Sequence, residues 1–259
     1  MLTTVAWMQS VDPAGAFVQL NAVPDQHVTV VGSFIRVPAL NQLVAAAAML
    51  DNTVAPQARI TAPSLRLRSL FRLEPQNGQS AAAVEPDSPQ KVTDLSLAPL
   101  VLVPGEDLRA EILSDPAAAQ IQSVVAWLAD GPLAPVRGNI FTVRATSAQV
   151  LVAQTWTNGA LTFVEDLPRG RYQVVGMRAK STGLVAARLV FVGPGASGWR
   201  PGVLGTDSEQ DLEWPGFRYG DWGVFGEFED TDPPTVDFLS VSADAAETVT
   251  LDLIQIRSP

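Results

Sequence analysis

The sequence predicts an all-β protein, built as an antiparallel β-sandwich or barrel with one short helix and long loops. Short segments in which apolar and polar residues alternate recur along the chain, which is the pattern of half-buried strands. Turn-forming dipeptides containing Gly, Pro, Asn or Asp separate these segments. The alternation of strands with long helical patterns that marks a parallel sheet is missing. We therefore expect one domain over 1–259.

Alternation is clearest in Ser64–Leu73, where leucines and Phe71 face one way and Arg66, Arg68 and Arg72 face the other. The same period of two predicts strands in Asn139–Ala145 and over 248–253. Further strands are expected at 3–9, 15–20, 27–35, 107–113, 121–129, 149–156, 160–165, 171–178, 184–192, 223–229 and 235–241.

Local signals place a hairpin and a helix. Asn158-Gly159 lies between two apolar segments, which favours a two-residue hairpin turn. The spacing of Leu40, Leu43, Val44 and Ala47 after Pro38 predicts a helix over 38–50. The region 1–62 is thus expected to hold the N-terminal strands and this helix.

Two stretches interrupt the strand pattern. Residues 74–96 are rich in Pro, Gln, Ser and Ala, and we expect a long surface loop there. Residues 193–232 contain nine of the 19 glycines and three of the six tryptophans, together with many acids. A loop longer than about 15 residues is usually functional or disordered. Because this one is rich in tryptophan, we expect it to be ordered.

Composition argues against most enzyme classes. The chain has no cysteine, one histidine (His27) and two lysines, and it contains no nucleotide-binding or nucleophile motif. A single histidine without cysteine cannot make a zinc site of the usual kinds. We therefore expect no enzymatic activity, no cofactor and no bound zinc.

Charge and hydropathy limit the partners. The formal net charge is −10 and neither end carries a basic tail, so we expect no direct nucleic-acid binding. No apolar run reaches about 18 residues, and residues 1–10 lack the features of a signal peptide. The expectation is a chain without a membrane span, made in the cytoplasm.

Charged residues make up only 17% of the chain, below the roughly 25% of an average soluble domain. A large core or extensive subunit contacts would both explain this. Because aromatic residues and arginine are enriched at interfaces, we expect a homo-oligomer. The interface residues we predict are Arg66, Arg68, Arg72, Trp199, Trp214, Phe217 and Trp222.

Acidic residues crowd the region 207–232. Oxygen ligands suit calcium, so Asp207, Glu209, Asp211, Asp230 and Asp232 form a candidate calcium site, with a solvated acidic loop as the alternative. The same acids, together with Tyr219 and the neighbouring Trp and Phe residues, also have the composition of a carbohydrate site. A pair of carboxylates for glycoside hydrolysis is a third option.

Three segments, with their strand patterns, carry a resemblance to a known family. They are LVPGEDLRAEIL (102–113) followed by IQSVVAWLAD (121–130), LPRGRYQVVGMRAKSTGLVAARLVF (167–191), and TVDFLSVSADAAETVTLDLIQI (235–256). Each is expected to form a strand pair or hairpin. In this order they resemble the jelly-roll capsid (coat) proteins of icosahedral viruses and bacteriophages. The resemblance implies a jelly-roll fold and self-assembly; the chain departs from many coat proteins in lacking a basic arm.

Two functions follow as expectations. The first is a structural virion protein, a self-assembling capsid subunit made in the host cytoplasm and partnered by itself and by other virion proteins. The alternative is a carbohydrate-binding β-sandwich module of a phage spike or fibre. A glycoside hydrolase ranks third, since its carboxylates would come from one local run of sequence.

Overall fold

The computed structural model describes residues 1–50, 56–68, 71–77, 90–116, 118–192, 198–207 and 212–257, with backbone only for 66–68, 71, 76–77 and 257. These residues form two compact units. The N-terminal unit comprises the described residues from Thr4 to Pro132, and the C-terminal unit comprises Met1–Thr3 with those from Leu133 onward. The sequence predicts one domain over 1–259. Whether the two units fold together as that one domain stays a prediction.

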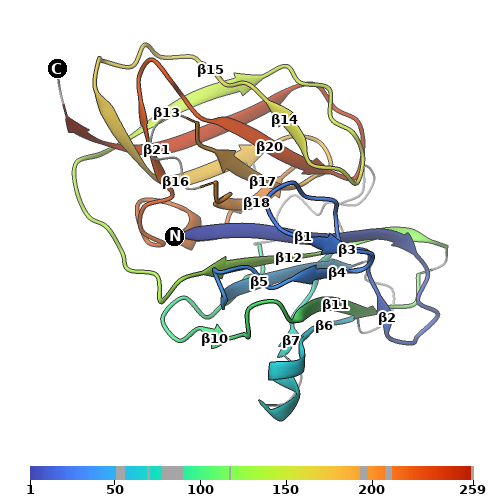
Figure 1. The fold of residues 1–259 in the computed structure, drawn as a ribbon. Helices are drawn as coiled ribbons and strands as arrows, with labels where there is room; N and C mark the ends of the chain where they lie inside the picture. Colours follow the sequence, from blue (N-terminus) through green and yellow to red (C-terminus); the bar gives the residue numbers. More distant parts are fainter. Residues whose placement is uncertain are drawn as a thin grey trace. The chain divides into compact units, whose positions relative to one another are not determined.

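The N-terminal unit contains two mainly antiparallel sheets (Figure 1). The first has the order β1-β12-β5-β10, and both β8 and β9 also pair with β5. The second has the order β3-β4-β11-β6-β7, with β2 also paired to β11. Their strands are β1 (Leu2–Val11), β2 (Val18–Gln19), β3 (Val30–Val31), β4 (Phe34–Arg36), β5 (Gln42–Leu50), β6 (Gln57–Thr61), β7 (Phe71–Leu73), β8 (Gln76–Asn77), β9 (Thr93–Asp94), β10 (Leu100–Val101), β11 (Asp107–Leu113) and β12 (Gln120–Ala129).

The C-terminal unit contains one curled nine-stranded sheet in the order β14-β20-β17-β18-β16-β21-β13-β15, with β19 paired to β16 (Figure 1). Its pairs are antiparallel except β16 with β18. Its strands are β13 (Ile140–Ser147), β14 (Thr157–Gly159), β15 (Thr162–Phe163), β16 (Arg171–Lys180), β17 (Leu184–Val190), β18 (Gly202–Thr206), β19 (Gly226–Glu229), β20 (Thr235–Ser240) and β21 (Glu247–Arg257). The predicted all-β, antiparallel class is confirmed.

The helix predicted over 38–50 is wrong, because this stretch contains strand β5. From Leu43 to Leu50 every residue is buried, so both faces of the strand are apolar and the period of two disappears from the sequence. Small side chains suit the site, since Ala45 lies opposite Trp127 of β12. An apolar run of this length is compatible with a buried strand as well as with a helix. No α-helix occurs in the described residues.

The strand predicted over Ser64–Leu73 is also wrong in its first half. Residues Pro63–Arg68 form a short 3₁₀ helix, η1, and only Phe71–Leu73 are strand. Pro63 fixes a helical φ angle, and the backbone N–H of Ser64 donates to the Glu106 carboxylate at 2.9 Å. Arg66 and Arg68 therefore do not share a strand face with Arg72.

Several pairings differ from those predicted. Asn158-Gly159 is no hairpin turn but part of β14, which pairs with β20, and the stretch 149–156 forms no strand. In each of the three segments that resemble coat proteins, the two consecutive strands do not pair with each other: β11 and β12 lie in different sheets, β18 separates β16 from β17, and β20 and β21 have other partners. Pairing is therefore mostly between strands distant in sequence.

The predicted long loop 193–232 contains strands β18 and β19 and a 3₁₀ turn, η2 (Pro215–Phe217). The glycines of β18 have a packing reason. A Cβ atom on Gly202 would lie 2.3 Å from the Ala187 carbonyl oxygen of β17, and one on Gly205 would lie 2.4 Å from that of Leu184. Part of the glycine content therefore marks a buried strand and not a loop.

Candidate functional site

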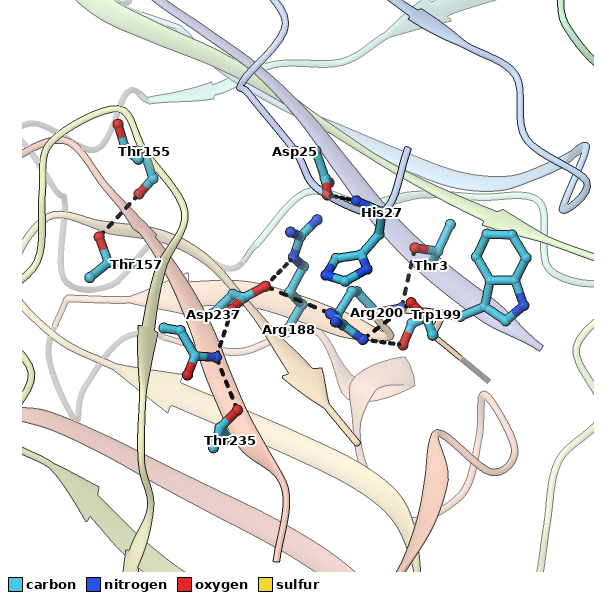
Figure 2. A network of polar contacts seen from close by, with 12 residues as sticks. Thr3, Asp25, His27, Thr155, Thr157, Arg188, Trp199, Arg200, Thr235 and Asp237 are labelled. Carbon is cyan, nitrogen blue, oxygen red and sulfur yellow. Dashed lines mark hydrogen bonds and ion pairs between the residues drawn. The ribbon is translucent and has the colours of Figure 1, made fainter. Parts of the chain in front are cut away.

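A network of buried charges joins β17, β20 and the segment before β18 (Figure 2). The Asp237 carboxylate lies 3.1 Å from Nε of Arg188 and 3.9 Å from Nε of Arg200. All three residues are buried, Arg188 to 2% exposure. Because a buried charge must be paired and hydrogen-bonded, this cluster fixes the position of Arg200 against the sheet.

Strand β14 completes the network. Asn158 donates to Oδ1 of Asp237 at 2.8 Å and to the Thr235 hydroxyl at 2.9 Å (Figure 2). The guanidinium of Arg188 lies 4.0 Å from the centre of the Trp156 ring, in a cation–π contact. The Asp237 carboxylate is thus satisfied by protein donors on both oxygens, which suits a structural role.

The predicted interface residue Trp199 lies next to this network and is half-buried. The backbone N–H of the following residue, Arg200, donates to the Thr3 hydroxyl at 3.3 Å, and its Nη1 donates to the Gly198 carbonyl at 3.1 Å (Figure 2). These contacts position the backbone that leads into β18.

A second buried ion pair lies in the same unit. The Arg218 guanidinium binds Asp252 of β21 through two contacts, Nε to Oδ2 at 2.7 Å and Nη2 to Oδ1 at 2.9 Å. Asp252 is fully buried, and it also accepts from the Thr142 hydroxyl at 2.7 Å and from the Tyr219 backbone N–H at 3.0 Å. Gly176 leaves the necessary room, since a Cβ atom there would lie 2.4 Å from Oδ2.

The electrostatics of this pair follow from its contacts. Burial by itself raises the pKa of the Asp252 carboxyl, but the hydrogen bonds from Arg218, Tyr219 and Thr142 outweigh burial, and the net pKa is lowered. The pKa of Arg218 is raised, because its bonds to Asp252 and the nearby charge of Glu213 outweigh its burial. Both groups therefore stay charged over the whole physiological range.

The aromatic residues of the loop form an internal cluster. The ring centres of Trp214, Phe217 and Trp222 lie 5.0–5.2 Å apart in edge-to-face arrangements. Phe217 and Trp222 are buried and Trp214 is half-buried, within their own unit. Tyr219, in contrast, is 55% exposed and adopts a left-handed backbone conformation with φ +54°.

The outer face of the second sheet of the N-terminal unit carries most of that unit's arginines. Arg59 forms an ion pair with Glu111 at 2.5 Å. Asp107 forms two ion pairs, with Arg36 at 2.5 Å and with Arg109 at 3.3 Å. Two phenylalanines support them: Arg59 lies over the Phe17 ring at 3.8 Å, and Arg36 and Arg109 lie over Phe34. A hollow of about 240 Å³ opens on this face, lined by Arg59, Thr61, Ala62, Pro63, Asp107, Arg109 and Glu111.

Of the three arginines predicted at an interface, Arg72 is exposed on this face and donates to Gln57 at 3.2 Å. The side chains of Arg66 and Arg68 lie outside the described residues. The structure of a single chain does not test whether these arginines and the tryptophans lie at a subunit interface. That role stays a prediction.

The candidate calcium ligands are only partly described. Glu209 and Asp211 lie outside the described residues. Asp207 accepts from the Gly183 backbone N–H at 3.0 Å, Asp230 accepts from that of Gly170 at 2.8 Å, and Asp232 is exposed. Within the described part of the chain, no three acidic or histidine side chains lie close enough to hold a metal ion.

Sequence reasoning missed the buried charges. Arg188 interrupts an otherwise apolar strand, a signal that could have identified it, whereas Asp252 follows Thr248 and Thr250 on the polar side of an alternating strand and carries no such signal. Glu247, the first residue of β21, is 1% exposed, and neither carboxyl oxygen makes a hydrogen bond to the described residues. Burial first, and then the nearby charge of Asp244, raises the pKa of Glu247 to about 7.

His27 lies at a bend, where its backbone N–H donates to Asp25 at 2.8 Å (Figure 2).

Among the described residues, no helix has the length and apolar character needed to cross a membrane.

Comparison with known proteins gives little further guidance. No family model matches the chain, and no curated protein matches it. Among solved structures, the chain is similar to the major capsid protein P2 of bacteriophage PM2, with 14% identity over 93% of this chain and 98% of that one. The TM-score is 0.22, a value too low to establish a shared fold.

Proposed function

We propose that this chain is a structural protein that assembles with copies of itself, and that it serves as a capsid subunit of a virion. The observation that supports it most directly is the combination of open sheet edges with exposed apolar side chains. Such edges are templates for contact with another chain, and soluble monomers usually protect them.

The clearest example is the edge of the first sheet in the N-terminal unit. Strand β10 ends the strand order and, among the described residues, pairs with β5 alone. Around it, Leu97 is 79% exposed, Val101 56% and Val103 57%. Three exposed apolar side chains within seven residues, at an edge strand, favour a protein partner over solvent.

The C-terminal unit offers a similar edge. Strand β15 ends its nine-stranded sheet, and Val164, directly after it, is 61% exposed. Lysine is the residue that most often protects such edges. The chain has only two lysines, Lys91 and Lys180, and neither lies in β10 or β15.

The virion context rests on the order of the strand segments, which resembles that of icosahedral coat proteins. In this proposal the partners are further copies of the chain and other virion proteins, and synthesis takes place in the host cytoplasm. No catalytic activity, cofactor or direct nucleic-acid contact forms part of it.

The test is the assembly state of the purified, untagged chain. We expect concentration-dependent association in light scattering, and shells or regular multimers in negative-stain electron microscopy. Replacing Val101 and Val103 with lysine should raise the concentration at which association begins, while Val31→Lys, on the edge strand of the other sheet, serves as the matched comparison. A chain that stays monomeric at every concentration tested would contradict the proposal.

The second candidate, a carbohydrate-binding module of a spike or fibre, is favoured by Tyr219. This exposed ring is held by the backbone hydrogen bond to Asp252 and by the Arg218 guanidinium, 4.6 Å from the ring centre. A rigid exposed ring is a suitable stacking surface for a sugar. Binding to a glycan array that is lost in Tyr219→Ala, by a chain that stays monomeric, would support this candidate instead.

A further inference from the structure

We propose that the arginine face of one copy binds an acidic turn of a second copy, so that assembly proceeds through two unlike surfaces. The arginine face consists of Arg36, Arg59, Arg72 and Arg109 with Asp107 and Glu111. The acidic turn is Glu229–Asp232, which begins at the last residue of β19. This inference rests on the proposed self-assembly and names the surfaces that mediate it.

The arginine face has more cations than anions. Strand register places its members on one side of the sheet, since Arg36 lies opposite Asp107, Arg59 opposite Glu111, and Arg59 also opposite Arg72. Four arginines stand against two carboxylates, an excess of two positive charges in a chain whose net charge is −10. This face is therefore electropositive on an acidic protein.

Among the described side chains of this face, Arg72 is the arginine that has no ion pair with a carboxylate. It lies directly opposite Arg59, whose own charge is taken up by Glu111, and its hydrogen bond goes to the neutral amide of Gln57. Like charges directly opposite each other destabilise a sheet. A carboxylate from outside would relieve this repulsion, and guanidinium groups bind carboxylates through two parallel hydrogen bonds.

The face also has space for such a group. The hollow of about 240 Å³ has both Arg59 and Arg109 in its lining, and its volume is several times the ~30 Å³ that one water occupies in the liquid. Arg109 keeps 40% of its side-chain surface exposed while it contacts Asp107. A carboxylate side chain entering the hollow meets Arg59 and Arg109 beside Glu111 and Asp107, the carboxylates that already pair with them.

The acidic turn is held in place by backbone hydrogen bonds. The backbone N–H of Asp230 donates to the Gly170 carbonyl at 3.0 Å, and that of Asp232 donates to the Glu229 carbonyl at 2.8 Å. Phe228, next to the turn, is buried, with its ring stacked against that of Tyr172 at 5.5 Å. A turn held in this way loses little conformational entropy on binding.

Two carboxylates of the turn are available to bind a partner. Glu229 and Asp232 are exposed, and no described arginine or lysine side chain pairs with either of them. Arg171, opposite Glu229 in the register, is instead bound to Glu227 at 2.6 Å. Two exposed carboxylates match in number the two excess cations of the arginine face.

Because the two surfaces differ, the contact is head-to-tail. Contacts of this type close into rings or continue as open arrays, depending on the rotation between copies. They also depend on salt, since exposed charges are screened beyond about 8 Å at physiological ionic strength.

The test is a charge swap between two variants. In Arg72→Glu/Arg109→Glu the arginine face becomes acidic, and in Glu229→Arg/Asp232→Arg the turn becomes basic. Alone, each variant places like charges together, and we expect the onset of association in light scattering to shift to at least about tenfold higher concentration. Mixed in equal amounts, each variant offers the surface that complements the other, and association should return close to the wild-type concentration.

Arg137→Glu is the control, a charge reversal at an exposed arginine of the C-terminal unit that belongs to neither proposed surface. It should assemble like the wild type. Circular dichroism establishes that each variant is folded, and the neutral pair Arg72→Gln/Arg109→Gln, with a smaller shift expected, replaces the first variant if it unfolds. Variants that assemble like the wild type, or a mixture that fails to recover, would overturn the inference and leave the proposed self-assembly standing. A wild-type chain that never associates would overturn both.

Discussion

The two units treat charge in opposite ways. All the buried charged residues that the structure describes lie in the C-terminal unit: Arg188, Arg200, Arg218, Asp237, Glu247 and Asp252. In the N-terminal unit the described core contains apolar and neutral polar side chains, and its arginines lie on an outer sheet face. The N-terminal unit therefore depends on apolar packing in its core. The C-terminal unit also depends on buried ion pairs, which hold long connecting segments against its sheet.

The largest expected effect comes from breaking a buried pair. Arg218→Ala leaves Asp252 buried without its cation, which costs about 3–5 kcal/mol of unfolding free energy. The measurement is guanidinium chloride unfolding followed by tryptophan fluorescence, which reports on the nearby Trp214 and Trp222. Arg137→Ala, which removes an exposed pair with Asp221, is the control and should cost about 0–1 kcal/mol. Equal losses in the two variants would show that burial of the pair is unimportant.

The next effect tests packing in the N-terminal unit. Ala45→Leu adds volume inside β5 directly opposite Trp127, and overpacking of this kind costs about 1–3 kcal/mol. Ala119→Leu, at an exposed position, should change the unfolding free energy by less than about 0.5 kcal/mol. If Ala45→Leu were neutral, the contact between β5 and β12 would be looser than the structure shows.

The same contrast explains how much of the fold could be predicted. Strands with one buried and one exposed face were predicted almost to the residue, as in β11 and β13. Strand β5 was mistaken for a helix because both its faces are buried and no alternation survives. The strand order was not predicted because most partners are distant in sequence, as when β14 pairs with β20.

The candidate site was predictable only in part for a similar reason. Arginine and aromatic content singled out Arg72, Trp214 and Trp222 as interface residues from local sequence, a role that stays a prediction. Local sequence does not show which charges meet, and the pairs Arg218–Asp252 and Arg188–Asp237 are separated by 34 and 49 residues. Trp214 and Trp222 pack on one another within their own unit, and their predicted contact with a neighbouring subunit stays a prediction.

A pH titration sharpens the comparison between the units. Burial raises the pKa of the Glu247 carboxyl from its ordinary value of 4.5 to about 7. A carboxyl group whose pKa is higher in the folded than in the unfolded state contributes stability at pH values below its unfolded-state pKa. This contribution is lost as the pH rises through its folded-state pKa. The free energy of unfolding should therefore fall between pH 4.5 and 7. Asp252, with a lowered pKa, acts in the opposite direction only at more acidic pH.

Glu247→Gln should remove this decline, because the amide carries no charge to desolvate. The measurement is urea unfolding at a series of pH values, with Asp12→Asn, an exposed carboxylate of the N-terminal unit, as the control. A wild-type slope that survives in Glu247→Gln would assign the pH dependence to another group.

The smallest expected effect concerns the exposed Tyr219. Its left-handed backbone, φ +54°, costs a residue with a Cβ atom roughly 1–2 kcal/mol and costs glycine little. Tyr219→Ala and Tyr219→Gly both remove the ring and its contact with Arg218, so their difference isolates the backbone strain. We expect the glycine variant to be more stable by about 1 kcal/mol in guanidinium chloride unfolding. Equal stabilities would mean that the loop relaxes when the ring is lost, and that the ring and Arg218 together, rather than the bond to Asp252, hold the conformation.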